Sequence, residues 1–306
     1  MNNKIIVDIV ESNYNEILSI RKHLHSYPEL SEQEYETSKY IENLLNKWGV
    51  KYKKVADTGI FAYIKNGNGK KIAFRADMDA LPINEQTDVD FKSKHENIMH
   101  ACGHDIHMAV QLGVVKCLVE NMNLWSGEVR FFFQPAEETV GGAKRMLLEG
   151  VNDDKADAIF GLHCAPEIKA GNIGIKYGKL HATSAVFNLE IVGKSAHAAL
   201  AYKGIDSIVI ATKVVDYLQT IVSRKIDARD CAVITVGTFN GGVAENVVAE
   251  KTTLTGTIRT LTKETKKYIV DIINHELKDF VKSHGAKLNV SIRDSYAPVI
   301  NDNDMT

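Results

Sequence analysis

The sequence has no surplus of positive charge and few prolines. Its 37 Lys and Arg residues stand against 39 Asp and Glu residues, which gives a net charge of -2. Without a basic excess, nothing in the composition indicates a nucleic-acid partner. Five prolines and 21 glycines among 306 residues are too few for a collagen-like or low-complexity chain.

Long hydrophobic runs and paired cysteines are also missing. Asp8 interrupts the first residues before an apolar core of signal-peptide length is reached. The charge-free stretch Cys231–Ala244 contains Thr, Asn and Gly and is shorter than the ~20 residues needed to cross a bilayer. The four cysteines show no CxxC spacing, which is typical of reduced thiols in the cytosol. We therefore expect a soluble, cytoplasmic protein that binds neither nucleic acid nor membrane.

The apolar sequence that is present is sufficient for two globular domains. Hydrophobic residues make up 44% of the chain, and its 306 residues exceed the usual ~100–200 residues of one domain. In the N-terminal part strands alternate with helices, which predicts an α/β fold with a helix-covered mixed, largely parallel sheet. From about Leu180 the pattern predicts strand–helix–strand–strand–helix–strand, the order of a ferredoxin-like α+β unit. We predict a first domain formed by residues 1–179 and 295–306, into which a second domain of residues 180–294 is inserted.

Two local patterns make sharper predictions about the N-terminal part. Ser31-Glu32-Gln33-Glu34 has the form of a capping box, in which Ser31 and Glu34 bond to the free amides at a helix start. The turn Asn66-Gly67-Asn68-Gly69 separates strands predicted at 60–65 and 71–75, and Asn-Gly favours a tight hairpin. These two strands are therefore predicted to pair with each other in antiparallel fashion. Further elements are predicted as strands at 128–133, 158–162, 232–238 and 247–258 and as helices at 104–121, 142–149 and 263–284.

The densest group of reactive side chains is His100-Ala101-Cys102-Gly103-His104-Asp105-Ile106-His107, at a predicted helix start. Thiolate and imidazole are good ligands for zinc-like metals, and one irregular turn could direct both Cys102 and His104 at one ion. The positive end of a helix favours the thiolate form of Cys102, and Asp105 is placed to orient a histidine ring. A helix cap with surface histidines is the alternative, but it explains this density of ligand side chains poorly.

Two further groups follow predicted strands. Glu137 and Glu138 end an aromatic strand, where one carboxylate could bind a metal while the other acts as general base. Acids that merely favour a helix start are an equally common alternative. His163 taken alone is more often a packed core histidine, but the carboxyl ends of neighbouring strands meet at one edge of a sheet. Asp77 and Asp79 follow another strand, as ligands, as supporting acids or as a polar turn.

These motifs together resemble the di-metal amidohydrolase family of aminoacylases, hippurate hydrolases and auxin-conjugate hydrolases. The resemblance implies a catalytic α/β domain with an inserted lid of ferredoxin-like topology, through which two chains form a homodimer. It also implies two divalent metal ions, with manganese or zinc favoured and cobalt or nickel compatible with the mixed ligand set. The matching strings run in family order over nearly the whole chain: RKHLHSYPELSEQE (21–34), RADMDALPI (75–83), HACGHDIH (100–107), FQPAEE (133–138), GLHCAP (161–166) and GKSAHAA (193–199).

The resemblance assigns roles to individual residues of the first domain. It implies that Cys102 bridges the two ions, that His104 and His163 complete one metal site, and that Glu138 binds the other ion. Glu137 is then the general base. Asp77 stands where the peptidases of the wider clan have the first histidine of His-x-Asp-x-x-Pro, so His104 is expected to replace that imidazole. Asp79 is expected to support the site without binding metal itself.

In the predicted lid, the resemblance implies that His197 stabilises the oxyanion of the reaction, often across a dimer, and that Asn246 and Arg259 hold the substrate carboxylate. A strand cap and an exposed salt-bridge arginine are the alternatives for the last two residues. Family members carry a further metal-binding histidine after the lid. The chain ends at Thr306, before that position, so we expect either a fragment or a product of reduced activity.

The implied reaction is metal-dependent hydrolysis of the amide bond of an N-acyl amino acid, such as hippurate or an N-acetyl amino acid. No motif encodes the acyl group or the amino-acid side chain. One alternative is a cysteine hydrolase in which Cys102 is the nucleophile and a histidine is the base. Two others are a small-peptide hydrolase and a chain of little or no activity that binds metal and ligand and dimerises.

Overall fold

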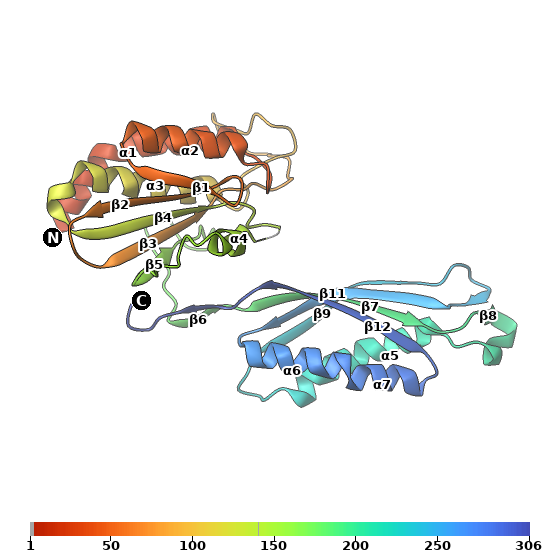
Figure 1. Ribbon diagram of the computed structural model, residues 1–306. Coiled ribbons are helices and arrows are strands. Elements are labelled where there is room, and N and C mark those ends of the chain that lie inside the picture. The colour runs from red at the N-terminus through yellow and green to blue at the C-terminus, as the bar shows by residue number, and fades with distance from the viewer. Residues whose placement is uncertain (1–2, 140) are drawn as a thin grey trace. The chain divides into compact units, whose positions relative to one another are not determined.

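The structure is a computed structural model that describes residues 3–139 and 141–306. It divides into two compact units, Met1–Ala170 and Gly171–Thr306, which we call the N-terminal and C-terminal units (Figure 1). Whether residues 171–179 and 295–306 belong with the first domain, as the sequence predicts, stays a prediction. No helix in the described part of the chain combines the length and the apolar character needed to cross a membrane.

The N-terminal unit is built on a five-stranded sheet with the order β1-β2-β4-β3-β5. The neighbours β4, β3 and β5 run parallel, whereas β1 pairs with β2 and β2 with β4 in antiparallel fashion. This mixed, helix-covered sheet confirms the predicted α/β class. The elements are α1 (Asn3–Ser26), α2 (Tyr35–Lys47), β1 (Lys51–Val55), β2 (Gly59–Asn66), β3 (Lys71–Asp77), α3 (His104–Glu120), a 3-10 turn η1 (Met122–Leu124), β4 (Gly127–Gln134), α4 (Gly142–Leu148) and β5 (Ala158–Gly161).

Three consecutive phenylalanines of β4 define the two faces of this sheet. Successive side chains of a strand point to opposite faces, so Phe131 and Phe133 lie on one face and Phe132 on the other. Phe131 and Phe133 are fully buried in the core that the sheet forms with α1, α2 and α3, which gather on one side of the sheet in Figure 1. Phe132 belongs to a smaller core that includes Met146 of α4. Helices therefore cover both faces, and β4 runs through the middle of the unit.

The predicted hairpin between the strands that flank Asn66–Gly69 is wrong. Strand β4 lies between β2 and β3 and pairs with both, so Ile60 faces Phe133 and Ala76 also faces Phe133 across the two ladders. The Asn-Gly turn does reverse the chain, but β4 fills the gap because its apolar side chains gain more from burial on both faces than a two-stranded hairpin would.

The predicted capping box is also wrong. Helix α2 begins at Tyr35 after Glu34, and the Glu34 side chain makes no hydrogen bond to the helix amides. Ser31 instead donates its hydroxyl proton to Asp79 Oδ2 at 2.6 Å, and Glu34 turns into the core. Both residues of the motif are used in tertiary contacts rather than in a local cap.

A buried ion pair network fixes α1 to the start of α3. His25 donates from Nδ1 to Asp105 Oδ2 at 3.0 Å and from Nε2 to Glu85 Oε1 at 3.1 Å. The hydrogen bond with Asp105, reinforced by Glu85, raises the pKa of His25 above its usual range despite burial. Both ring nitrogens therefore carry protons, and Arg21 adds a second positive charge at Asp105.

We expect His25→Gln to lower the free energy of unfolding by about 3–5 kcal/mol, because it leaves the buried Glu85 carboxylate without a cation and leaves Asp105 with Arg21 alone. The folded-state pKa of His25 is raised, so its stabilisation is complete below the unfolded-state value and is lost as the pH rises through the folded-state value. The penalty should therefore be larger at pH 6 than at pH 9 in urea denaturation. The exposed Lys22–Asp90 pair is the control, since Lys22→Gln should cost under about 1 kcal/mol. An equal penalty for His25→Gln at both pH values would contradict a charged His25.

The C-terminal unit contains the predicted ferredoxin-like arrangement. Its antiparallel four-stranded sheet has the order β12-β7-β11-β9, with helices packed on it. The predicted helix over 263–284 is interrupted at His275, which separates α6 from α7. The elements are β6 (Gly178–His181), β7 (Thr183–Val192), β8 (Ala196–His197), a 3-10 segment η2 (Ala198–Lys203), α5 (Ser207–Thr220), a π-helical turn η3 (Ile221–Lys225), β9 (Ala232–Gly241), β10 (Val247–Val248), β11 (Lys251–Thr260), α6 (Lys263–Asn274), α7 (Glu276–Ser283), β12 (Lys287–Tyr296) and β13 (Val299–Asn301).

Candidate metal centre

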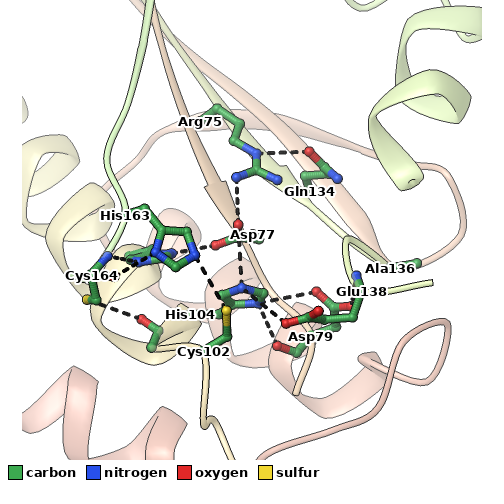
Figure 2. A network of polar contacts seen from close by, with 12 residues as sticks. Arg75, Asp77, Asp79, Cys102, His104, Gln134, Ala136, Glu138, His163 and Cys164 are labelled. Carbon is green, nitrogen blue, oxygen red and sulfur yellow. Dashed lines mark hydrogen bonds and ion pairs between the residues drawn. The ribbon is translucent and has the colours of Figure 1, made fainter. Parts of the chain in front are cut away.

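The predicted reactive groups meet at one edge of the N-terminal sheet. In the parallel ladders, Asp77 at the end of β3 faces Gln134 at the end of β4, and Arg75 faces Gly161 at the end of β5. The segments that follow these strands carry Asp79, Glu137, Glu138 and His163, and α3 begins beside them at His104 (Figure 2). The expectation that these motifs converge at one sheet edge is therefore confirmed.

Cys102, His104 and His163 form one group of possible metal ligands. One donor atom of each lies within 4.8 Å of the others. His163 donates from Nδ1 to the carbonyl oxygen of Cys164 at 2.7 Å, because a carbonyl can only accept. Its Nε2 lone pair therefore points toward Cys102 Sγ, which is 3.4 Å away. Backbone contacts thus fix the tautomer that a metal ligand requires.

His104 faces a gap between buried acceptors. Its Nδ1 donates to the backbone oxygen of Asp79 at 2.8 Å, which leaves Nε2 as the atom available to a metal. Nε2 lies 3.8 Å from Glu138 Oε1, and neither atom has a hydrogen-bond partner among the described residues although both are buried. His104, Glu137 and Glu138 form a second group with donor atoms within 4.8 Å of one another. Nε2 also lies 3.6 Å from Asp77 Oδ2, and the hydrogen bond with Asp79 together with the Asp77 and Glu138 carboxylates raises the pKa of His104 against the effect of burial. The site therefore favours positive charge beside Nε2, which a proton or a metal ion can supply.

Negative charge controls the protonation of this site. Burial and the neighbouring Glu138 carboxylate raise the pKa of Glu137. Burial, together with Glu138 and Glu137, raises the pKa of Cys102 to about 12. The expectation that the helix start favours the thiolate is therefore not met by the protein's own groups, since burial and the nearby carboxylates raise the pKa of Cys102 more than the helix start lowers it. A metal ion supplies the positive charge that a Cys102 thiolate needs in this position.

Asp77 and His107 form a third group of possible ligands with His104; a ligand or supporting role for Asp77 was among the predicted alternatives, whereas His107 was not singled out. Asp77 accepts from Arg75 Nη1 and from His107 Nδ1, each at 2.6 Å. Burial by itself would raise the pKa of Asp77, but these two partners hold it well below its usual range. His107 accepts the Cys164 N–H at Nε2, 2.9 Å away, so both of its nitrogens are engaged. In the sequence, the i, i+3 spacing of His104 and His107 on α3 could have indicated that His107 lies on the same helix face as His104, close to the site.

Two other residues of the His100–His107 motif lie outside the ligand groups. Asp105 was predicted to orient a metal-binding ring, but the ring it binds is that of His25. Asp79 takes that role for His104, through its backbone oxygen and its carboxylate at 3.3 Å. His100 is buried, and burial lowers its pKa to about 4, so it is neutral near pH 7.

The residues predicted to act from the lid all lie in the C-terminal unit. His197 on β8 pairs with Val247 on β10, and the backbone oxygen of Asn246 accepts from the N–H of Ala198 at 3.0 Å. His197 and Asn246 are thus neighbours, and both are exposed. Arg259 is also exposed, near the far end of β11, where it pairs with Ser184. The C-terminal unit therefore brings two of the three predicted residues together.

The N-terminal unit is a mixed α/β fold in which a thiol, imidazoles and paired carboxylates gather at the ends of the strands. This combination is typical of metal-dependent hydrolases of the two-metal class. Residues 73–306 match the family model described as Peptidase family M20/M25/M40, and the chain belongs to this family. It is 41% identical to N-acetyl-L-cysteine deacetylase of Bacillus subtilis (strain 168) over 293 residues, which are 95% of this chain and 70% of that protein.

Two further comparisons agree with this assignment. The chain is 39% identical over 300 residues to N-acetyldiaminopimelate deacetylase of Lactobacillus acidophilus, covering 95% of this chain and 78% of that protein. The solved structure of the Bacillus subtilis YXEP protein, described as a dinuclear metal binding peptidase from the M20 family, is similar with a TM-score of 0.82 and 34% identity. That similarity covers 95% of this chain and 77% of the solved one. Three groups of possible ligands share His104, and those with Cys102 and His163 and with Glu137 and Glu138 fit such a dinuclear centre.

Proposed function

We propose that this protein hydrolyses the amide bond of N-acyl amino acids with two divalent metal ions bound at the candidate centre. The observation that carries the proposal is the pair of facing buried atoms, His104 Nε2 and Glu138 Oε1, which have no hydrogen-bond partner among the described residues and lie beside Cys102 and His163. The family relatives named as deacetylases of N-acetyl-L-cysteine and N-acetyldiaminopimelate support the substrate class. We propose Cys102 as the ligand shared by both ions, with His104 and His163 at one and Glu138 at the other.

Divalent ions in such a site lower the pKa of water and polarise a carbonyl group. In the proposed reaction Glu137 accepts one proton from the attacking water as its oxygen bonds to the amide carbon. The C–N bond then breaks, and Glu137 returns that proton to the leaving amine. Its raised pKa suits both roles, because the carboxyl group can hold the proton between the two steps. Asp79 keeps the ring of His104 in one tautomer while this occurs.

The lid residues support a homodimer as part of the proposal. Eight residues separate Lys251 from Arg259, which places Arg259 roughly 26 Å along β11 from the end near His197. One chain therefore cannot direct His197 and Arg259 at the same substrate from this one sheet. We propose that His197 donates to the oxyanion in the partner's site with Asn246 beside it at the substrate, while Arg259, at the other end of β11, binds a substrate carboxylate in the other site. Sedimentation velocity should then give twice the mass of one chain, and a monomer would contradict this arrangement.

We propose an N-acetyl amino acid as the substrate and manganese or zinc as the metal. An N-acetyl amino acid is favoured over hippurate because both named relatives remove acetyl groups. Manganese or zinc suits a centre of one thiol, imidazoles and carboxylates, and a cytoplasmic location suits free thiols. Both metal binding and the alternative of a cysteine nucleophile need the Cys102 thiolate, whose pKa is raised by burial and by the neighbouring carboxylates, so the dependence on metal decides between them.

The test is an assay with N-acetyl, N-benzoyl and dipeptide substrates before and after chelation. We expect release of the free amino acid from at least one N-acyl amino acid, loss of that activity in chelator, and recovery on adding Mn²⁺ or Zn²⁺. Activity that survives complete removal of metal would favour a cysteine hydrolase. Metal binding without turnover of any substrate would favour a ligand-binding protein.

A further inference from the structure

The short segment from Ser31 to Glu34 binds the loop that carries Glu137 and Glu138 directly through Glu34 and indirectly, through Asp79, from Ser31. Glu34 Oε1 accepts the backbone N–H of Ala136 at 2.7 Å. Ser31 donates to Asp79 Oδ2, and the same oxygen accepts the backbone N–H of Glu138 at 2.9 Å. The residues on either side of Glu137 are therefore each held by an acid, and both acids are tied to this segment. We propose that Glu34 and Ser31 are positioning residues for Glu137 and Glu138, an inference that rests on the proposed function.

The backbone at Ala136 needs such support. Its φ of 49 lies in the left-handed region, which residues with a side chain rarely adopt, and it directly precedes Glu137. Ala136 is completely buried, so water cannot satisfy its amide. Its carbonyl oxygen accepts from the N–H groups of Gly141 and Gly142, and its own N–H is bound by Glu34. The conformation that turns Glu137 away from β4 is therefore fixed by hydrogen bonds on both sides of one residue.

Packing around Pro135 restrains the same loop. A Cβ atom on Gly59 would lie 2.7 Å from Pro135 Cδ, and one on Gly142 would lie 2.1 Å from the Pro135 carbonyl oxygen. Only glycine permits these approaches, so the loop is clamped between the β1–β2 turn and the start of α4. With Pro135 fixed by contacts and Ala136 by Glu34, the loop has little freedom to shift.

The side chain of Glu34 does not cap helix α2, although Glu34 directly precedes that helix. Glu34 is 0% exposed and makes no cap bond to α2. Its second carboxylate oxygen, Oε2, accepts a hydrogen bond from the Thr58 hydroxyl at 2.7 Å. Burial raises the pKa of Glu34, while the hydrogen bonds from Thr58 and Ala136 act in the opposite direction. A buried carboxylate is unfavourable unless its acceptors are used, and one of its two main partners is the loop beside the site acids. The unfavourable burial of Glu34 is explained if its carboxylate holds the backbone beside Glu137 in place.

Two substitutions of matched size separate the hydrogen bond from the charge. Glu34→Gln keeps an oxygen that accepts the Ala136 N–H, whereas Glu34→Leu keeps the bulk and removes the acceptor. We expect Glu34→Gln to retain kcat within about threefold. Glu34→Leu should lower kcat by about 100-fold with KM changed far less, because a displacement of about 1 Å at the reacting groups costs that much. It should also weaken binding of one Co²⁺ to the apoprotein about 10- to 100-fold, measured by visible absorption.

Thr58→Val is the control for a purely structural role. It removes the other partner of the same buried carboxylate, so it should lower the melting temperature while kcat and Co²⁺ affinity stay within about threefold. If Glu34→Leu does not fold, Ser31→Ala tests the second contact at a partly exposed position and should lower kcat about tenfold with unchanged KM. Unchanged kcat and Co²⁺ affinity in Glu34→Leu, or equal losses in Thr58→Val, would overturn the inference.

The Co²⁺ titration keeps this test separate from the proposed function. If the wild-type protein hydrolyses no N-acyl amino acid, the proposed function fails. The Co²⁺ affinities of the variants then still decide whether Glu34 positions Glu138 for metal binding. Should the wild-type protein be active and Glu34→Leu match it in both readouts, only the positioning inference fails.

Discussion

Glu137→Gln should bind both metal ions and lose almost all turnover. Glu137 lies within the carboxylate group beside His104, and its pKa is raised by burial and by Glu138. The amide of glutamine occupies the same space but cannot accept a proton from water or return it to an amine. General acid–base catalysis contributes about 10²–10⁴-fold, so kcat should fall by that factor.

The measurement for this variant pairs kcat with metal content. Metal analysis of the purified Glu137→Gln protein should show the same stoichiometry as the wild type, since Cys102, His104, His163 and Glu138 remain. Glu167→Gln, an acid in the segment after β5, is the matched control and should keep full activity. A Glu137→Gln protein that turns over at the wild-type rate would remove Glu137 from the mechanism and leave the identity of the base open.

Cys102→Ala should lose bound metal and, with it, activity. Cys102 Sγ lies beside His163 Nε2 and within 4.8 Å of the donor atom of His104, and it is proposed to contact both ions. Substitution of a residue that only supports a metal ligand already lowers metal affinity or activity by about 10- to 100-fold. Removal of a shared ligand should therefore lower kcat/KM by more than about 100-fold and reduce the metal content below two ions per chain.

Other cysteines of the chain provide the controls. Cys117 lies on the same helix, α3, away from the ligand groups, and Cys231 lies in the C-terminal unit, so Cys117→Ala and Cys231→Ala are suitable. Both variants should retain metal and activity. Because a cysteine hydrolase would also be inactive without Cys102, the metal content decides between the two mechanisms. An inactive Cys102→Ala protein that still holds two ions would favour the nucleophile.

The types of residue in the site could be predicted from the sequence, but their partners could not. Cys102, His104, Glu138 and His163 stand in motifs whose chemistry suits a metal, and the structure brings them to one sheet edge. Asp105 has the same appearance in the sequence, yet it binds His25 on a different helix. A side chain carries its ligand chemistry wherever it lies, whereas its hydrogen-bond partner depends on which distant segment packs beside it.

The same difference explains the errors in the fold. An Asn-Gly turn is a local signal, and it correctly marks a chain reversal between β2 and β3. The insertion of β4 between those strands is a contact between segments about sixty residues apart, which no local pattern reports. Ser31 and Glu34 have the spacing of a capping box, but the buried amide of Ala136 and the carboxylate of Asp79 compete for them and bind them instead.

By itself, the sequence determined the alternation of strands and helices, the ferredoxin-like order of the C-terminal unit and the set of side chains proposed to bind metal. Those features follow from local periodicity and from functional groups that each residue carries alone. Only the tertiary structure decided the tautomer of His104, the raised pKa of Cys102 and the clamp on the Glu137 loop. Each of these depends on burial and on electrostatic neighbours that folding brings together from separate parts of the chain.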